Sequence, residues 1–76
     1  SQENTLRGRE IGKALDGFLK GLPKDSRVIF LRRYWYADSV AGIAKRYGMT
    51  ESKVKMQLLR TRGKLKDYLE QEGIQI

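Results

Sequence analysis

Residues 38–65 read DSVAGIAKRYGMTESKVKMQLLRTRGKL, and three positions in this stretch, Ala44, Gly48 and Val54, indicate how it folds. Two helices that meet at a steep angle across a short connection need a small residue where they cross, and Ala44 supplies it. Gly48 can adopt the positive φ that ends a helix. Thr50 can then cap the next helix, because its hydroxyl accepts a hydrogen bond from a free amide of the first turn. The spacing is that of a helix-turn-helix over about residues 39–66.

The second helix of this motif has an apolar stripe formed by Val54 and Leu58, which lie one turn apart and can pack on Ile43 and Ala44. Met49 is expected to turn inward at the connection. The opposite face of the helix stays exposed, and in DNA-binding versions of the motif that face enters the major groove.

Apolar periodicity and chain breakers predict further helices on the N-terminal side. Pro23 suits a first helical turn because it lacks an amide that would be unpaired there, and Gly21 ends the preceding helix. Asp38 or Ser39 could cap the third helix. No strand-like alternation is present, so the sequence predicts an all-α domain. The expected helices cover about residues 6–20, 24–34, 39–47 and 51–73.

Exposed and buried positions are harder to assign in two places. The second helix carries so broad an apolar face that we expect burial on more than one side. Four aromatic residues after Phe30 could stack on bases of a single strand, but helical placement next to Phe30 favours core packing; they are Tyr34, Trp35, Tyr36 and Tyr47. Met56 and Leu59 fall off the apolar stripe and should be exposed, so they are expected to meet DNA or a protein partner.

Length and charge restrict the function. The chain has 76 residues, which allows one small domain, and a formal net charge of +7, which favours a polyanionic partner such as nucleic acid. It contains no cysteine and no histidine, so we expect no disulfide, no metal site, no cofactor and no enzymatic activity. No signal-peptide profile or membrane span is evident, and we expect a cytoplasmic location.

The segments LPKDSRVIFLRRYWYADS (22–39) and GIAKRYGMTESKVKMQLLRTRGKL (42–65) together resemble region 4 of bacterial RNA polymerase sigma factors of the sigma-70 family. The closer likeness is to the extracytoplasmic-function (ECF) group, and it extends over about residues 15–69. It rests on Leu22-Pro23, Arg27, Ile29-Phe30, Arg33-Tyr34, Ile43-Ala44, Gly48, Val54-Lys55, Leu58, Arg60, Arg62 and Leu65.

This resemblance implies an all-α, four-helix domain containing a helix-turn-helix, a winged-helix-like sigma region 4 fold. The chain would be a single domain, residues 1–76, forming the C-terminal fragment of a longer sigma factor. It would read the promoter minus-35 element of double-stranded DNA and dock on the β-subunit flap of the RNA polymerase core, and an anti-sigma factor is a further partner that the resemblance suggests. The implied DNA-binding residues are Arg33, Ser39, Val40, Glu51, Ser52, Lys53, Lys55, Met56 and Arg60.

Within that set the resemblance implies distinct roles. Ser52, Lys55 and Met56 align with base-reading positions and Arg33 with a phosphate contact, while the helix start at Ser39 and Val40 would offer backbone amides to a phosphate. A methionine can touch a thymine methyl but brings no charge. Residue 42 is glycine where the family commonly has glutamate, which should loosen the third helix by roughly 0.5 to 1 kcal/mol.

Three other interpretations remain at this level. The lysines and arginines of residues 53–66 could be an ordinary solvated face, because acidic residues interleave with them. A LuxR-type response-regulator domain has four helices and a similar central motif. A protein-interaction module could retain the helix-turn-helix fold without reading bases.

Overall fold

Four α-helices form the computed structural model, which describes residues 2–74 and the side chains of residues 9–74. Ser1 and residues 75–76, which the expected domain includes, lie outside the described part. The described residues contain no strand, so the all-α, four-helix class is confirmed. The winged-helix-like character of the expected fold therefore refers to the helices alone, because the described residues form no β-strand wing. The helices are α1 (Gln2–Gly21), α2 (Lys24–Tyr34), α3 (Val40–Tyr47) and α4 (Glu51–Gln71).

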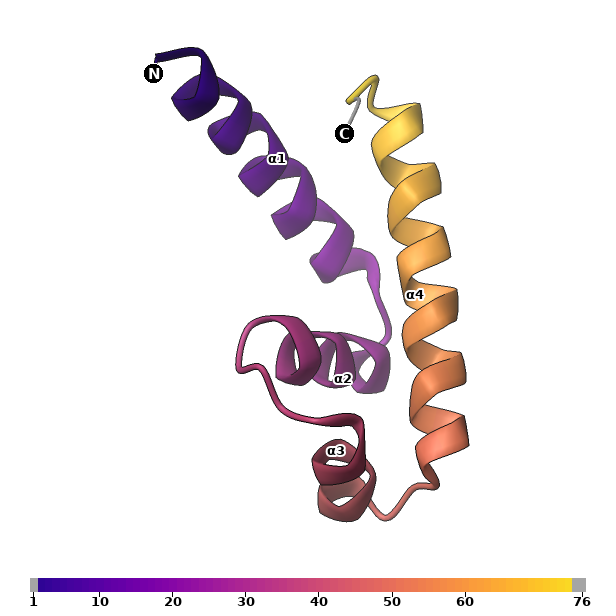
Figure 1. Ribbon diagram of the computed structural model, residues 1–76. Coiled ribbons are helices and arrows are strands. Elements are labelled where there is room, and N and C mark those ends of the chain that lie inside the picture. Colours follow the sequence, from indigo (N-terminus) through magenta and orange to yellow (C-terminus); the bar gives the residue numbers. More distant parts are fainter. Residues whose placement is uncertain (1, 75–76) are drawn as a thin grey trace.

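Helix α4 runs along one side of the molecule, which measures 42 × 24 × 18 Å. Helices α2 and α3 pack against its first half, while α1 approaches its second half and diverges from it toward the N-terminus (Figure 1). The three other helices therefore lie on one side of α4 and leave its outer side uncovered. None of the helices in residues 2–74 has an apolar stretch long enough to cross a lipid bilayer.

The core of the helix-turn-helix is an apolar cluster contributed by three helices. Ile43 of α3 and Val54 of α4 are completely buried, and Ala44 and Leu58 are nearly so. Ile29 of α2 closes the cluster. Burial of a side chain the size of Val, Leu or Ile stabilises a fold by about 1.5–3 kcal/mol. Several such side chains are shared between α3 and α4, so their packing holds the two helices in this relative orientation. The predicted packing of the α4 stripe on α3 is confirmed.

A second cluster joins α1 to the rest of the domain. Phe18 of α1 meets the Phe30 ring edge-on, at 6.5 Å between centroids, and the Tyr68 ring of α4 at 5.6 Å. A Cβ at Gly17 would lie 2.7 Å from the Tyr68 hydroxyl oxygen, so glycine allows the tyrosine to lie against α1. Because Ile29 and Phe30 enter different clusters, α2 is buried on two sides, as expected from its broad apolar face.

Most helix ends lie where the local sequence signals predict them. Ser39, and not Asp38, caps α3, and α4 ends close to the expected position, followed by Gly73 at φ 74°. The main difference is at the start of the chain, where α1 begins at Gln2 instead of near Leu6.

The expectation that the aromatic residues after Phe30 are core residues is wrong. Trp35 is 79% exposed, and Tyr34, Tyr36 and Tyr47 are exposed as well. Helix α2 ends at Tyr34, and the chain then turns through Ala37, a non-glycine residue at φ 57°. This turn carries Trp35 and Tyr36 beyond the end of the core, whereas Tyr34, the last residue of α2, stacks on Phe30 at 4.8 Å between ring centroids, and Tyr47 is the last residue of α3.

Candidate nucleic-acid interface

The corner between α3 and α4 is built from three residues whose backbone conformations are suited to it. Gly48 adopts the left-handed conformation, at φ 64° and ψ 38°. The Met49 amide donates to the Ala44 carbonyl oxygen at 2.9 Å, which closes the last turn of α3. The Thr50 hydroxyl accepts from the Lys53 amide at 3.1 Å and caps α4. The chain thus restarts as a helix at once, and the first turns of α4 project beyond α3.

These first turns of α4 are not buried in the domain. Predicted site residues Glu51, Ser52, Lys53, Lys55, Met56 and Arg60 are all exposed. Each helical residue advances by about 100°, so positions opposite the buried Val54 and Leu58 form the outer face. Ser52 and Met56 lie at the centre of that face, and Gly63 continues it toward the C-terminus.

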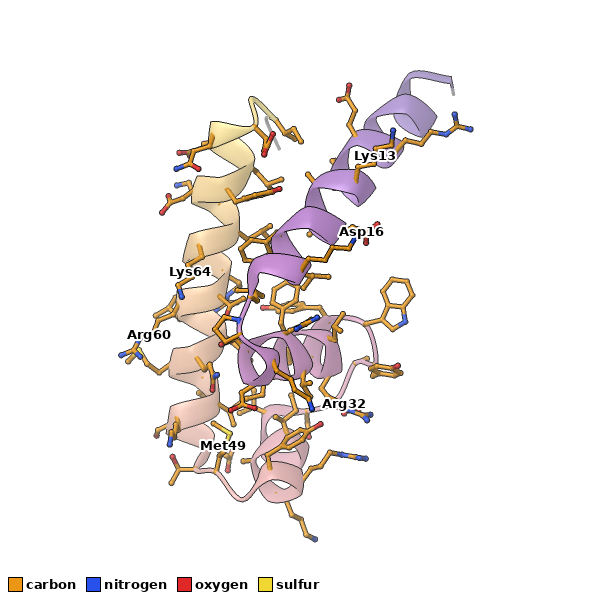
Figure 2. All side chains as sticks on the ribbon, turned by 180° about the vertical axis from the view of Figure 1, so that it is seen from behind. Lys13, Asp16, Arg32, Met49, Arg60 and Lys64 are labelled. Carbon is orange, nitrogen blue, oxygen red and sulfur yellow. The ribbon has the colours of Figure 1, made fainter. Side chains whose placement is uncertain are left out.

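Cations flank this outer face on both sides. By helical rotation, Lys53, Arg60 and Lys64 form a row along one edge, about 16 Å long, and Lys55, Arg62 and Lys66 form a row along the other edge. Arg60 and Lys64 extend from the side of α4 that faces away from α2 and α3 (Figure 2). The first row borders an open groove of about 650 Å³, in which Ser26 and Ser52 add hydroxyl groups. Neither Ser26 nor Lys64 is among the DNA-binding residues that the resemblance implies.

The start of α3 carries the second group of predicted site residues. The Ser39 hydroxyl accepts from the Gly42 amide at 2.9 Å. Val40 packs its side chain partly on the core, so it can contribute to a binding site through its backbone amide. Arg33 is exposed and donates to the Asp38 carbonyl oxygen at 3.3 Å, which places the guanidinium beside this helix start. Since a guanidinium has five N–H donors, one such bond leaves most of them available.

The neighbouring Arg32 has a different environment. Its guanidinium lies 4.8 Å from the centre of the Tyr36 ring and 3.8 Å from the Asp38 carboxylate. A hydrogen bond with the Tyr47 hydroxyl, followed by the charges nearby, raises the pKa of Arg32 above its ordinary value. Arg32 therefore connects the end of α2 to the loop that follows it, whereas Arg33 faces solvent.

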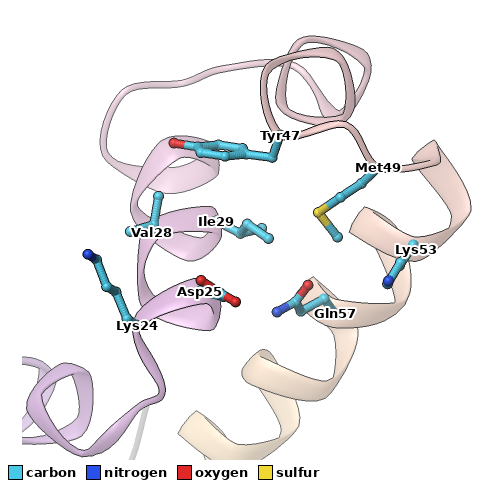
Figure 3. Close-up of a pocket in the computed structure, with 8 residues that line it drawn as sticks. All are labelled: Lys24, Asp25, Val28, Ile29, Tyr47, Met49, Lys53 and Gln57. Carbon is cyan, nitrogen blue, oxygen red and sulfur yellow. The ribbon is translucent and has the colours of Figure 1, made fainter.

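A smaller pocket of about 470 Å³ lies between α2, the end of α3 and α4 (Figure 3). The Met49 side chain and the Gln57 amide point into it, and Lys24 and Lys53 stand at its margins. The Gln57 amide also donates to the Ser26 hydroxyl at 3.2 Å, a contact between α4 and the start of α2 that the sequence did not suggest. Asp25 is the one carboxylate among the lining residues, and these residues include no nucleophile paired with a base.

The helices that carry this surface also define the family. A family model described as "Sigma-70, region 4" matches residues 12–65, which include α2, α3 and the exposed first turns of α4. Comparison with curated proteins and with solved structures gave no significant match. Of the two helix-turn-helix families that the residues left open, the matched family is the sigma factors and not the LuxR-type regulators. The chain belongs to the sigma-70 region 4 family.

Proposed function

We propose that this chain recognises the minus-35 element of a promoter as region 4 of an ECF-type sigma factor, and that it does so by placing the first turns of α4 in the major groove. The observation that carries this proposal is the outer face of α4, which no other described helix covers and which cations flank on both edges. The major groove is about 12 Å wide, and an α-helix with its side chains is about 10–12 Å across, so the helix fits.

The arrangement of side chains on α4 suits both phosphate contacts and base contacts. Cations at the two edges of α4 would meet the phosphates of the two strands, which supply most of the affinity without sequence information. In this arrangement Arg33 and the α3 start at Ser39 and Val40 hold the backbone, together with Lys53 and Arg60. Ser52 and Met56 at the centre of the face would read the base edges, together with Lys55 from its edge, while Glu51 in the first turn could accept from a cytosine amino group.

The proposed protein partner is the RNA polymerase core, through the flap of its β subunit. Large exposed aromatic side chains are typical of interface hot spots, and Trp35 and Tyr36 lie at the α2–α3 turn, away from the outer face of α4. An anti-sigma factor could cover either surface and so regulate the domain. In this proposal the chain works as one domain of a longer sigma factor in the cytoplasm, where the polymerase and the chromosome are found.

Fluorescence anisotropy with labelled duplex DNA tests the proposal. If Arg33, Lys53 and Arg60 each neutralise one phosphate, log K should fall with log salt at a slope of about −2.7, or roughly 40-fold between 50 and 200 mM salt. Lys53→Ala or Arg60→Ala should reduce the steepness of this slope by about 0.9. Lys13→Ala is the matched control, because Lys13 is an exposed cation of α1 and lies far from the outer face of α4 (Figure 2).

Base reading requires a separate measurement. Lys55→Ala should reduce the difference between preferred and unrelated sequences by about 1–3 kcal/mol. Equal weakening on every sequence would assign Lys55 to a phosphate. Binding that does not change between low and high salt would refute the proposed duplex contact altogether.

A further inference from the structure

The outer face of α4 contains two large apolar side chains that the fold does not use. Met56 is 49% exposed and Leu59 is 56% exposed, and neither belongs to the apolar clusters of the domain. They are three residues apart, so they lie about 60° apart around the helix and about 4.5 Å apart along it. Both therefore face the same side.

The residues next to this pair on the outer face leave the two apolar side chains open to contact. Ser52 lies one turn before Met56, and Gly63 lies one turn after Leu59. The pair is therefore bordered along the face by the small side chain of serine at one end and by glycine, which has no side chain, at the other. The cations stand at the two edges. No charged residue occupies the strip between Ser52 and Gly63, which consists of Met56 and Leu59.

Base edges in the major groove present hydrogen-bond donors and acceptors, with one apolar group among them, the C5-methyl of thymine. Covering a donor or acceptor with a thioether or an isobutyl group would leave it without a partner, which is unfavourable. Contact with a thymine methyl has no such penalty and removes apolar area from water on both sides. The chemistry of the strip therefore selects thymine over the other bases.

Resting on the proposed function, we infer that Met56 and Leu59 read DNA through thymine C5-methyl groups. Their separation of about 4.5 Å along the helix compares with about 3.4 Å between successive bases of a strand. The preferred duplex therefore contains two thymines one or two base steps apart, one beneath each side chain. Charge and polarity at the centre of the face contribute little to the choice of base at those two positions.

Replacement of thymine by deoxyuridine tests this inference directly, because the two bases differ by the methyl group and keep the same pairing edge. A preferred duplex is first selected with the 76-residue chain from a pool with a randomised core, and each thymine is then replaced in turn. Loss of one buried methyl should weaken binding about fourfold at each of two positions. Anisotropy at fixed salt measures the change.

Variants of the chain assign each methyl to a side chain. Met56→Ala should abolish the deoxyuridine penalty at one position and Leu59→Ala at the other, while Lys13→Ala, which removes an exposed side chain of α1, should leave both penalties unchanged. Because Met56 and Leu59 are exposed, circular dichroism of the variants should match that of the parent chain.

The outcomes separate this inference from the function on which it rests. Sequence-selective binding with equal affinity for thymine and deoxyuridine would overturn the methyl contact and leave promoter recognition standing. Penalties that persist in both alanine variants would likewise overturn it, because other residues would then read the methyls. If no duplex in the pool is enriched at low salt, both proposals fail, and the apolar pair is better explained as a protein-docking surface.

Discussion

Two glycines of this chain should respond in opposite directions to the same substitution. Gly48 at the corner has a φ of 64°, whereas Gly63 lies within α4, and a Cβ added at either position would meet no atom within 4 Å. Steric clashes therefore play no part at either position, and the backbone conformation of the glycine determines how alanine changes the free energy of unfolding. Alanine in the left-handed conformation costs about 1–2 kcal/mol, partly offset by about 0.4–1 kcal/mol from the restricted unfolded chain. Gly48→Ala should thus destabilise the domain by about 1 kcal/mol.

Gly63→Ala should instead stabilise the domain by about 0.5–1 kcal/mol, because alanine is the better helix former at an exposed interior position. Urea denaturation followed by circular dichroism measures both effects. With a slope near 1 kcal/mol/M for so small a domain, the two midpoints should move by about 1 M or slightly less in opposite directions. Gly48→Asn should lose less stability than Gly48→Ala, since asparagine tolerates the left-handed region better. Midpoints that move in the same direction for the two alanine variants would refute the role assigned to the corner.

Two other substitutions test strain and close packing. Ala37→Gly should raise the free energy of unfolding by about 0.5–1 kcal/mol, because Ala37 has a φ of 57° that glycine adopts without strain; unchanged thermal melting would contradict this. Gly17→Ala should stabilise the domain by less than Gly63→Ala, because the gain of about 0.5–1 kcal/mol in helix propensity is offset by the shift of the Tyr68 side chain away from a Cβ that would lie 2.7 Å from its hydroxyl oxygen; removal of that hydroxyl by Tyr68→Phe should restore most of the gain, which a double-mutant cycle in urea can measure.

The central motif was predictable because its signals are local. A glycine that ends a helix and a threonine that caps the next one act within a few residues of the chain, and the structure places Gly48 and Thr50 in those roles. The exposure of the predicted α4 residues followed from the same reasoning, because helical periodicity sets the residues opposite Val54 and Leu58. Whether those exposed residues touch DNA stays a prediction.

The aromatic residues after Phe30 show where sequence reasoning failed. Hydrophobic character favoured burial, but exposure depends on where α2 ends and on the direction the chain takes at Ala37. The resemblance singled out Arg33 as a phosphate contact, but the sequence did not show that Arg32 contacts Tyr36 and Asp38. Those contacts involve residues of the loop that follows α2.

The sequence by itself determined the helix-turn-helix, most helix ends and the basic balance of the chain, because each of these arises from neighbouring residues or from composition. The tertiary structure alone decided that α2 divides Ile29 and Phe30 between two clusters, that Thr61 is buried and donates to the Gln57 carbonyl oxygen, and that α1 packs where Gly17 admits Tyr68. Periodicity defines the apolar face of a helix, but which neighbour covers that face depends on contacts between residues far apart in the chain.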